Sequence, residues 1–286
     1  MLKKQLFITT ENINKYIIDL KDKENANSTI EKYVRDIQAF AKFLDGRMIT
    51  KEIAIEWKVK LKETHAISSI NSMIAAINSF CNFFDFNIKI KQYKIQRQTF
   101  LPDKKDLSKE EYERILKAAN STKNERLFYI IQTICATGIR VSELQYITVE
   151  SVKAGQAIIT NKGKTRTIFI PNDLRNALLQ YAPKHKILSG FIFITKKGQC
   201  VNRSNIWAEM KKLCVIANVD PKKVFPHNLR SLFSRMFYSI DKDLAKLADM
   251  LGHSNVNTTR IYIMGNGSEH RKIIENLCLS KLKYVT

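Results

Sequence analysis

The sequence lacks the features that would assign it to a membrane, secreted or repetitive class. No apolar run reaches the length of a transmembrane span, and Met1-Leu2-Lys3-Lys4 is not followed by the long apolar segment of a signal peptide. Neither an internal repeat nor a low-complexity tract is visible. We therefore expect a cytoplasmic protein that has no membrane partner.

Cysteine pairs and clusters of metal ligands are also missing. The 5 cysteines are scattered, with no C-x-x-C pair, at Cys81, Cys135, Cys200, Cys214 and Cys278. This pattern predicts buried thiols in a reducing compartment and argues against a disulfide framework or a zinc site. No group of His, Cys, Asp or Glu has the spacing of metal ligands, so we expect no metal and no other cofactor.

Acidic residues are few compared with basic ones. The 286 residues include 27 Asp and Glu against 48 Lys and Arg, which gives a formal net charge of +21. The usual partner of such a basic surface is nucleic acid, and an anionic membrane surface is the alternative. A chain of this length has room for two domains, each with its own core.

The first hundred residues have helical periodicity. We expect helices over residues 12–20, from a capping box of Ser28 and Glu31, from Thr50 to Leu61, and over residues 68–84. Their apolar stripes predict a helical domain over residues 1–88, with Lys and Arg on the polar faces where a DNA backbone would lie. Residues 89–106 are basic, contain a proline and keep no period, which predicts a linker.

A second capping box, Ser108 with Glu111, begins the larger domain predicted over residues 107–286. Two β-branched runs flank Asn161-Lys162-Gly163-Lys164, which is typical of a β-hairpin, and Phe191–Thr195 is expected to form a third strand. Helices are expected from the residues around Arg140 and over 124–136, 172–181, 202–217, 227–239, 244–251, 257–263 and 269–278. The predicted fold is mainly α, with a small antiparallel sheet in the second domain.

Two histidines, an arginine and a tyrosine are concentrated near the C-terminus. His227 and Arg230 are spaced i and i+3, and Pro226 suits the first position of the helix that carries them. They would therefore project near a helix N-terminus, which favours an anion. His253 and Tyr262 follow. With the charge of the chain, these residues predict a phosphate site.

Taken singly, each of these features has an ordinary structural explanation. An H-x-x-R pair is commonly a satisfied surface pair, and Arg140 alone could pair with Glu143 on a helix surface. A lysine in a glycine-containing hairpin is an ordinary turn residue, and Tyr262 on an apolar helix is commonly part of a core. The joint pattern is what favours a site.

That joint pattern resembles the tyrosine recombinases, the phage-integrase family. Ala136–Leu144, which reads ATGIRVSEL, resembles the family's first conserved box. His227-x-Leu229-Arg230, followed by Leu251-Gly252-His253 and Tyr262, resembles the second. The hairpin over residues 161–166 resembles the loop that carries the family's catalytic lysine. The resemblance covers nearly the whole chain, because residues 29–43 and 68–84 resemble the family's core-binding helices.

The resemblance implies a set of catalytic residues. These are Arg140, Lys162, His227, Arg230, His253 and Tyr262. The tyrosine hydroxyl would attack a DNA phosphate and form a 3′-phosphotyrosyl bond, with the two arginines binding the phosphate oxygens. His227 would assist proton transfer at the tyrosine, His253 would donate to a phosphate oxygen, and Lys162 would protonate the departing 5′-oxygen. Glu143 is expected to orient Arg140.

The resemblance also implies the partners. We expect double-stranded DNA, a homotetramer on paired sites that proceeds through a Holliday junction, and an accessory directionality protein. No additional N-terminal arm-binding domain is expected, which is typical of the simpler Xer or integrative-element recombinases. The alternatives are a type IB topoisomerase-like enzyme, which shares the chemistry, and a non-catalytic DNA-binding protein on the same scaffold.

Three positions leave the assignment open. Ser231 stands where the family often has a second histidine, which suggests tuning of the site. Lys162 is preferred over Lys164 as the general acid because it directly precedes the glycine. Residues 269–278 are expected to form an apolar-striped helix that docks either on a neighbouring protomer, as in the family, or on its own domain.

Overall fold

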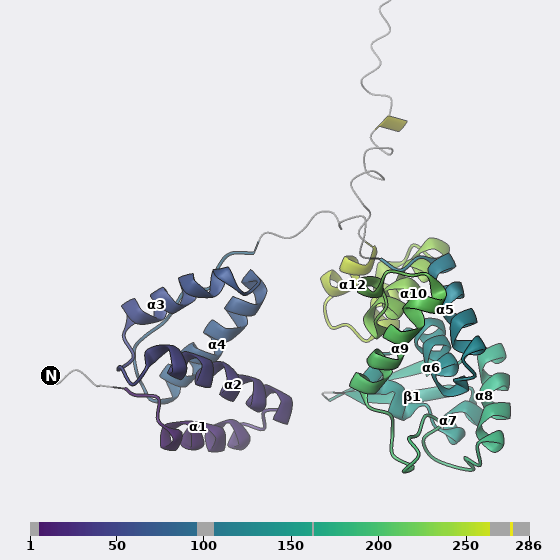
Figure 1. The fold of residues 1–286 in the computed structure, drawn as a ribbon, viewed down its shortest axis with the longest axis horizontal. Coiled ribbons are helices and arrows are strands. Elements are labelled where there is room, and N and C mark those ends of the chain that lie inside the picture. Colours follow the sequence, from purple (N-terminus) through teal and green to yellow (C-terminus); the bar gives the residue numbers. More distant parts are fainter. Residues whose placement is uncertain (1–5, 96–105, 162, 264–274, 277–286) are drawn as a thin grey trace, which may run out of the picture. The chain divides into compact units, whose positions relative to one another are not determined.

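The computed structural model describes residues 6–95, 106–161, 163–263 and 275–276. Backbone contacts divide the chain into two compact units, Met1–Arg97 and Gln98–Thr286. Figure 1 shows both units as mainly helical, which confirms the predicted fold class. Within the described ranges, no helix combines the length and the apolar character needed to cross a bilayer.

Four α-helices and one 3₁₀ turn build the first unit. They are α1 (Thr10–Asp22), α2 (Asn27–Leu44), α3 (Lys51–Lys60), η1 (Leu61–Glu63) and α4 (Ile67–Phe83). Thr50 caps α3 by accepting from the Ile53 N–H at 3.2 Å. The predicted capping box of Ser28 and Glu31 is wrong. Helix α2 already begins at Asn27 after Ala26, so Ser28 lies inside the first turn instead of at the cap.

Aromatic residues fill the centre of the first unit. Tyr16 meets Phe80 edge-on, with ring centroids 5.4 Å apart, and Phe40 packs against Trp57 at 4.7 Å. The segment that follows α4 is held along that helix, because the Asn78 amide bonds both backbone groups of Ile90 at 2.9 Å. The first residues of the predicted linker therefore pack on the first unit, and residues 96–105 lie outside the described ranges.

The second unit carries the remaining elements. They are α5 (Lys109–Ser121), α6 (Glu125–Thr137), η2 (Val141–Tyr146), α7 (Val149–Ala154), β1 (Gln156–Asn161), β2 (Lys164–Phe169), α8 (Asn172–Lys184), α9 (Arg203–Ala217), η3 (Pro221–Lys223), α10 (Pro226–Ile240), α11 (Leu244–Leu251) and α12 (Val256–Ile263). The capping box of Ser108 and Glu111 at the start of α5 is present as predicted.

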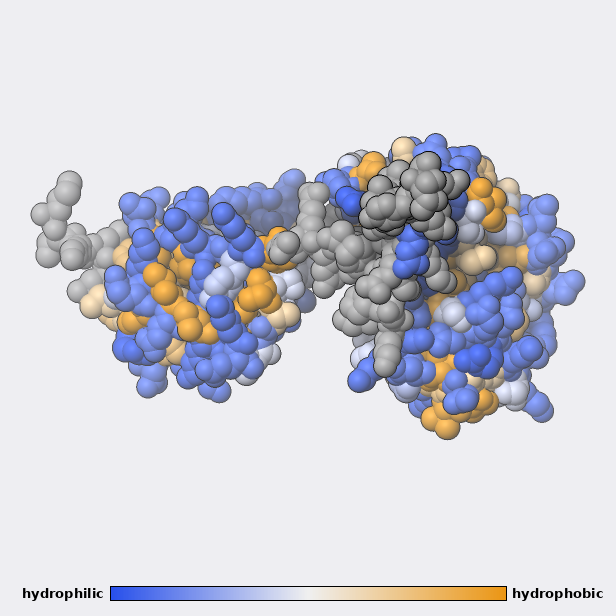
Figure 2. All heavy atoms as spheres, turned by 90° about the horizontal axis from the view of Figure 1, so that it is seen from above, coloured by the Kyte–Doolittle hydropathy of each residue, from blue (hydrophilic) through white to orange (hydrophobic). Residues whose placement is uncertain are grey.

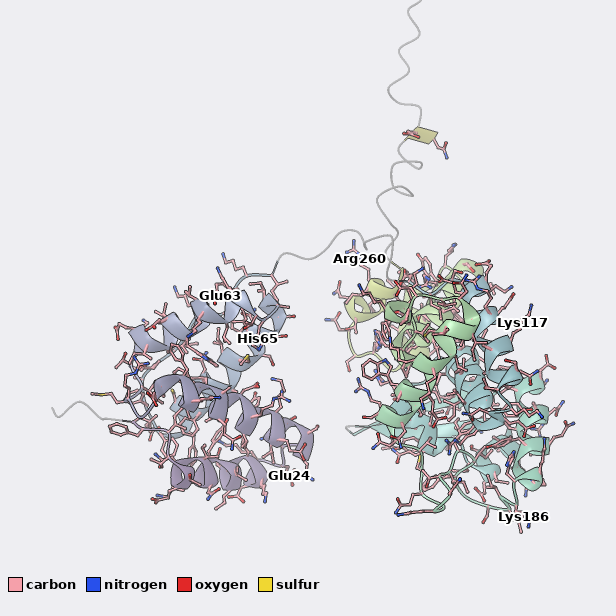
Figure 3. The ribbon with its side chains drawn as sticks, viewed as in Figure 1. Glu24, Glu63, His65, Lys117, Lys186 and Arg260 are labelled. Carbon is pink, nitrogen blue, oxygen red and sulfur yellow. The ribbon has the colours of Figure 1, made fainter. Side chains whose placement is uncertain are left out.

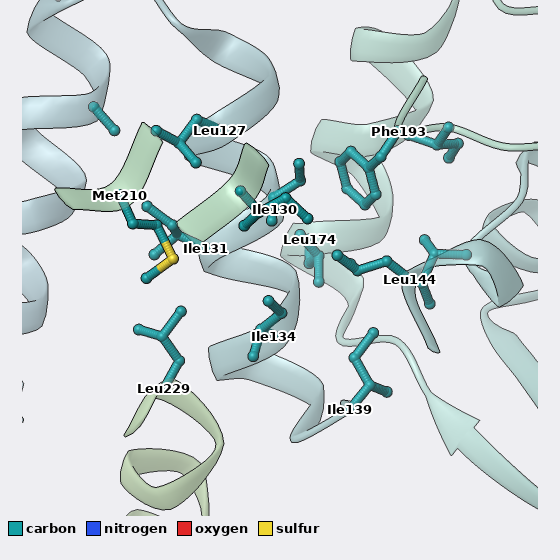
Figure 4. Close-up of a cluster of buried hydrophobic side chains, with 14 of the residues drawn as sticks. Leu127, Ile130, Ile131, Ile134, Ile139, Leu144, Leu174, Phe193, Met210 and Leu229 are labelled. Atoms are coloured by element: carbon teal, nitrogen blue, oxygen red, sulfur yellow. The ribbon is translucent and has the colours of Figure 1, made fainter. Parts of the chain in front are cut away.

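Helix α6 is the central element of this unit. Its residues Ile130, Ile131 and Ile134 are buried, and Met210 of α9 and Leu229 of α10 lie against them in Figure 4. Helix α6 packs against α5, α8, α9 and α10. Hydrophilic residues cover most of the visible surface of each unit in Figure 2, and charged side chains such as Lys117 and Lys186 point outward in Figure 3.

The sheet has two strands instead of three. Strands β1 and β2 pair antiparallel from Gln156↔Phe169 to Asn161↔Lys164, so positions 162 and 163 link them. The strand predicted over Phe191–Thr195 is wrong. Ile192 and Phe193 are fully buried, but the segment makes only isolated bridges, Thr148↔Phe191 and Ile194↔Cys200. Its β-branched and aromatic residues reflect burial in the core and not a continuous ladder.

Candidate active site

Two helices of the candidate site end in glycines with a left-handed backbone conformation. Gly138 ends α6 at φ 66° and Gly252 ends α11 at φ 65°. A Cβ on Gly252 would meet Arg166 Nη1 at 2.6 Å, and one on Gly138 would collide with the Phe233 ring. Only glycine fits both the backbone conformation and the space. The two turns therefore bring helix C-termini, with their unpaired carbonyls, close to the same point.

Arg230 occupies that point. Its side chain is 2% exposed, its Nη1 donates to Gly138 O at 2.5 Å, and its Nη2 donates to Leu251 O at 2.7 Å. The negative ends of two helix dipoles thus stabilise the guanidinium. Burial and the nearby Arg140 charge lower the pKa of Arg230 to about 10, although Tyr262 and Glu143 oppose this, so it stays charged at neutral pH.

One donor of this buried guanidinium remains free for a ligand. The Nε of Arg230 is buried and has no hydrogen-bond partner among the described residues. An unpaired buried donor costs about 1–3 kcal/mol. Arg230 also lines a pocket of about 730 Å³. An anion that enters this pocket would give the Nε its missing acceptor.

Basic side chains surround this pocket. Arg140 and His227 line it with Arg230, and α9 and η3 add further cations. The residues on these two elements that line it are Arg203, Ser204, Trp207, Lys211 and Lys222. None of the described residues that line the pocket is acidic. A concave site that is lined by several cations and by no acidic residue is typical of a phosphate-binding surface.

A buried carboxylate connects Arg140 to the β-hairpin. Glu143 is 1% exposed and accepts from the Arg140 backbone N–H at 2.7 Å and from Arg140 Nη1 at 2.9 Å. Arg166 on β2 donates to the same carboxylate through Nη1 at 3.1 Å and Nη2 at 2.7 Å. The interpretation that Glu143 orients Arg140 agrees with these contacts. Arg140 is the N-cap residue of the helix predicted here, which is the 3₁₀ helix η2, so its backbone N–H has no partner within the helix and is available for this bond.

Acid should weaken the network around Glu143. Burial alone would raise the pKa of the Glu143 carboxyl, but donation from Arg166 and Arg140 lowers it below the ordinary 4.5. Because the folded-state pKa is the lower one, the stabilisation is present above about pH 4.5 and is lost as the pH falls through the folded value. At pH 7, Glu143→Gln is expected to reduce the free energy of unfolding by about 3–5 kcal/mol.

Urea denaturation between pH 7 and pH 3 measures this effect. The free energy of unfolding of the Glu143→Gln variant should fall less steeply with acid than that of the natural sequence. Glu113→Gln, at an exposed position of α5, is the control and should leave both stability and slope nearly unchanged. Equal stability of the two variants at pH 7 would contradict the structural role of Glu143.

His227 lines the pocket from the first turn of α10. Its ring stacks on Phe225 with centroids 6.5 Å apart and lies 5.3 Å from the Tyr262 ring. Surrounding protein atoms displace water from part of the ring, and the charges of Arg230 and Arg140 add to this, so the pKa of His227 is lowered. A neutral imidazole next to a phenol can accept its proton.

Tyr262 lies on α12, next to the ring of His227, which lines the pocket. It is 7% exposed and packs with Leu247 and Leu251 of α11. Its ring stacks on that of His253, with centroids 5.7 Å apart and an interplanar angle of 16°. The proximity of Tyr262 raises the pKa of Arg230, in opposition to burial and to the Arg140 charge. The candidate nucleophile is therefore held beside two imidazoles and a guanidinium.

The structure brings together five of the six predicted site residues: Arg140, His227, Arg230, His253 and Tyr262. Lys162 lies outside the described residues, so the choice between Lys162 and Lys164 remains a prediction. Ser231 is buried and its hydroxyl accepts from Arg235 Nη1 at 3.0 Å. Within the described part of the chain, no cluster of three or more His, Cys, Asp or Glu could hold a metal.

Sequence reasoning missed two polar residues of the site, Arg166, whose side chain is 13% exposed, and Thr259, which is fully buried. Arg166 lies two residues before the buried Ile168 on β2, and residues two apart in a strand point to the same face. This spacing could have shown that Arg166 points inward. Thr259 is fully buried three residues before Tyr262, on the same face of α12. The pocket-lining residues of α9 and η3 were missed because nothing in their sequence spacing relates them to Arg140 or His227.

Comparisons with known proteins match both units. The profile described as "Phage integrase family" matches residues 105–268, and "Phage integrase, N-terminal SAM-like domain" matches residues 13–85. Tyrosine recombinase XerD of Halalkalibacterium halodurans is 28% identical over 267 residues, which cover 83% of this chain and 87% of that protein.

Solved structures share the fold. XerH site-specific recombinase bound to palindromic difH substrate, in a post-cleavage complex, aligns with a TM-score of 0.74 at 19% identity, covering 95% of this chain and 84% of that one. A lambda integrase tetramer bound to a Holliday junction aligns with a TM-score of 0.72 at 15% identity, covering 91% of this chain and 78% of that one.

Proposed function

We propose that this chain, which belongs to the phage integrase family, is a site-specific DNA recombinase that cuts and rejoins DNA through Tyr262. The observation that carries the proposal is the buried Arg230 guanidinium with its unpaired Nε, set beside the hydroxyl-bearing Tyr262 and its two histidines. The geometry supplies an anion site and an adjacent nucleophile. A DNA phosphodiester could occupy the anion site with its charged oxygens and present its phosphorus to the nucleophile.

In the cleavage step the Tyr262 oxygen forms a bond to phosphorus and the bond from phosphorus to the 5′-oxygen breaks. His227 takes the phenolic proton, and Lys162 gives a proton to the departing 5′-oxygen. The pentacoordinate transition state carries additional negative charge on its non-bridging oxygens. Arg140 and Arg230 bind these oxygens, and each such donor typically contributes on the order of 10²–10³ in rate.

Rejoining reverses this step with the 5′-hydroxyl of another strand. One phosphodiester is exchanged for another, so no external energy source is needed. Exchange between two duplexes requires four cleavages, and we infer a homotetramer on paired sites, with one Tyr262 acting on each strand.

Because the proposed substrate is cellular DNA, we infer a cytoplasmic location. We also infer an accessory directionality protein as a further partner. The topoisomerase-like and non-catalytic alternatives are not favoured by the family match.

A nicked duplex tests this function directly. When cleavage releases a short 5′-hydroxyl fragment that diffuses away, the covalent complex accumulates and migrates slowly on a denaturing gel. The duplex should carry the sequence that flanks the gene, which is our candidate for the DNA target. Formation of the adduct in excess EDTA is the expected result, because Arg140 and Arg230 supply the positive charge at the phosphate. Absence of any adduct, with DNA binding retained, would favour the non-catalytic alternative.

The two hairpin lysines can be separated by changing the leaving group. With an ordinary duplex, the cleavage rate of Lys162→Ala should be about 10²–10⁴-fold lower than that of the natural sequence, because the 5′-oxygen then leaves without a proton donor. A duplex with sulfur at the 5′-bridging position should restore the rate, because a thiolate leaves without a proton. Single-turnover cleavage measures both rates. Lys164→Ala is the control, and the reverse pattern would assign the general acid to Lys164.

A further inference from the structure

Thr259 is a buried hydroxyl that the catalytic steps above do not use. It lies on α12, is fully buried, and is one turn before Tyr262. Its Oγ1 lies 2.8 Å from Nδ1 of His253. This contact joins the helix of the nucleophile to the loop that follows α11. The neighbouring Thr258 is exposed, so the two threonines offer an internal comparison.

The other ring nitrogen of His253 fixes the position of its proton. Nη2 of Arg230 lies 3.0 Å from Nε2 of His253. A guanidinium has donors and no acceptor, so Nε2 must accept and the proton of the neutral ring must sit on Nδ1. That Nδ1–H then donates to Thr259 Oγ1. In the free protein, His253 is therefore an acceptor on the side that faces Arg230.

The surroundings of His253 favour this neutral ring. The titratable and charged side chains that face it come from α10 (His227 and Arg230), from the residue before η2 (Arg140), from β2 (Arg166) and from α12 (Tyr262). Burial first, and then the positive charges of the three arginines, lower the pKa of His253 to about 4. A second proton on the ring is thus opposed from several sides.

Donation to a phosphate requires the opposite arrangement of the His253 proton. The role proposed for His253 places a proton on Nε2, directed at a non-bridging oxygen. If Nε2 carries the proton of a neutral ring, Nδ1 must accept a hydrogen bond. A hydroxyl can accept from Nδ1–H in one state and donate to bare Nδ1 in the other, whereas an apolar side chain can do neither.

We propose that Thr259 is a positioning residue whose hydroxyl holds the His253 ring and partners both of its tautomers. In the free protein Thr259 accepts from Nδ1–H. When a DNA phosphate takes the place of His253 as the acceptor for Arg230, one proton leaves Nδ1, one is taken up from water at Nε2, and the threonine hydroxyl turns to donate to Nδ1. The inference rests on the proposed function, since it requires a phosphate at this site.

Three variants test the role of the hydroxyl. Thr259→Val keeps the shape and removes the hydrogen bond, and Thr259→Ser keeps the hydroxyl. Thr258→Val makes the same change on the exposed face. We expect single-turnover cleavage of the nicked duplex at saturating DNA to fall by about 10- to 100-fold in Thr259→Val, as is typical when the partner that orients a functional histidine is lost. The dissociation constant for DNA should not change, and both other variants should cleave near the normal rate.

A measurement on the natural sequence does not depend on how the variants fold. With ¹⁵N-labelled histidine, the nitrogen shifts and one-bond couplings of His253 should show the proton on Nδ1 in the free protein. A proton on Nε2 in the free natural protein would overturn the inference, as would Thr259→Val cleaving as fast as Thr258→Val. Failure of the natural protein to cleave any duplex, with the tautomer as expected, would instead count against the proposed function.

Discussion

Replacing Tyr262 with phenylalanine is expected to abolish covalent attachment to DNA and to leave DNA binding nearly unchanged. The ring of Tyr262 packs with Leu247 and Leu251, and phenylalanine keeps that packing while removing only the attacking oxygen. Loss of a covalent nucleophile reduces the rate by on the order of 10⁶ in a well-studied hydrolase. The measurement is adduct formation on the nicked duplex, together with a binding titration of the same DNA.

Tyr238→Phe is the matched control for that experiment. Tyr238 packs against the same small cluster, and its loss of a hydroxyl is chemically identical. This variant should form the adduct at the normal rate. A stable adduct from Tyr262→Phe would show that another residue attacks the DNA, and it would remove the basis of the proposed mechanism.

The second large effect is expected at Arg230. Arg230→Lys keeps a positive charge, but a lysine cannot reproduce the fork that reaches Gly138 O, Leu251 O and a phosphate together. Cleavage should slow by on the order of 10²–10³, the usual cost of removing one donor to a developing oxyanion. Arg230→Ala would in addition leave two buried carbonyls unpaired, at about 1–3 kcal/mol each.

Single-turnover cleavage and thermal unfolding should be measured on the same samples, so that lost chemistry is separated from lost stability. Arg235→Lys is the control. Arg235 lies on the same helix, but it pairs with Asp106 at 3.0 Å and donates to Leu107 O at 2.5 Å, and it does not line the pocket. Cleavage by Arg230→Lys at the rate of Arg235→Lys would be incompatible with a phosphate-binding role for Arg230.

The helices and their ends could be predicted well from local sequence signals. The capping box at Ser108, the proline that begins α10, and the glycines that end α6 and α11 all act through neighbouring residues, so they can be identified without knowledge of the fold. The Ser28 box failed for a related reason. A capping sequence is a local preference, and α2 begins earlier, at Asn27, without a side-chain cap.

Tertiary contacts limited the other predictions. The run at Phe191–Thr195 has strand composition, but its residues fill the core beside α6 and find only isolated backbone partners. Periodicity cannot distinguish a buried irregular segment from a strand. The polar contacts of the site also depend on the tertiary fold. Arg166 reaches Glu143 across 23 positions of sequence, and only the folded hairpin brings them together.

The most direct test of the central claim is to locate the covalent bond between protein and DNA. The adduct trapped on the nicked duplex can be digested with trypsin and nuclease and analysed by tandem mass spectrometry. Trypsin cuts after Arg260 and Arg271, so the peptide of interest is Ile261–Arg271. The account predicts that this peptide carries a nucleotide joined through its 3′-phosphate to Tyr262. A nucleotide on any other residue, or a bond through a 5′-phosphate, would contradict it.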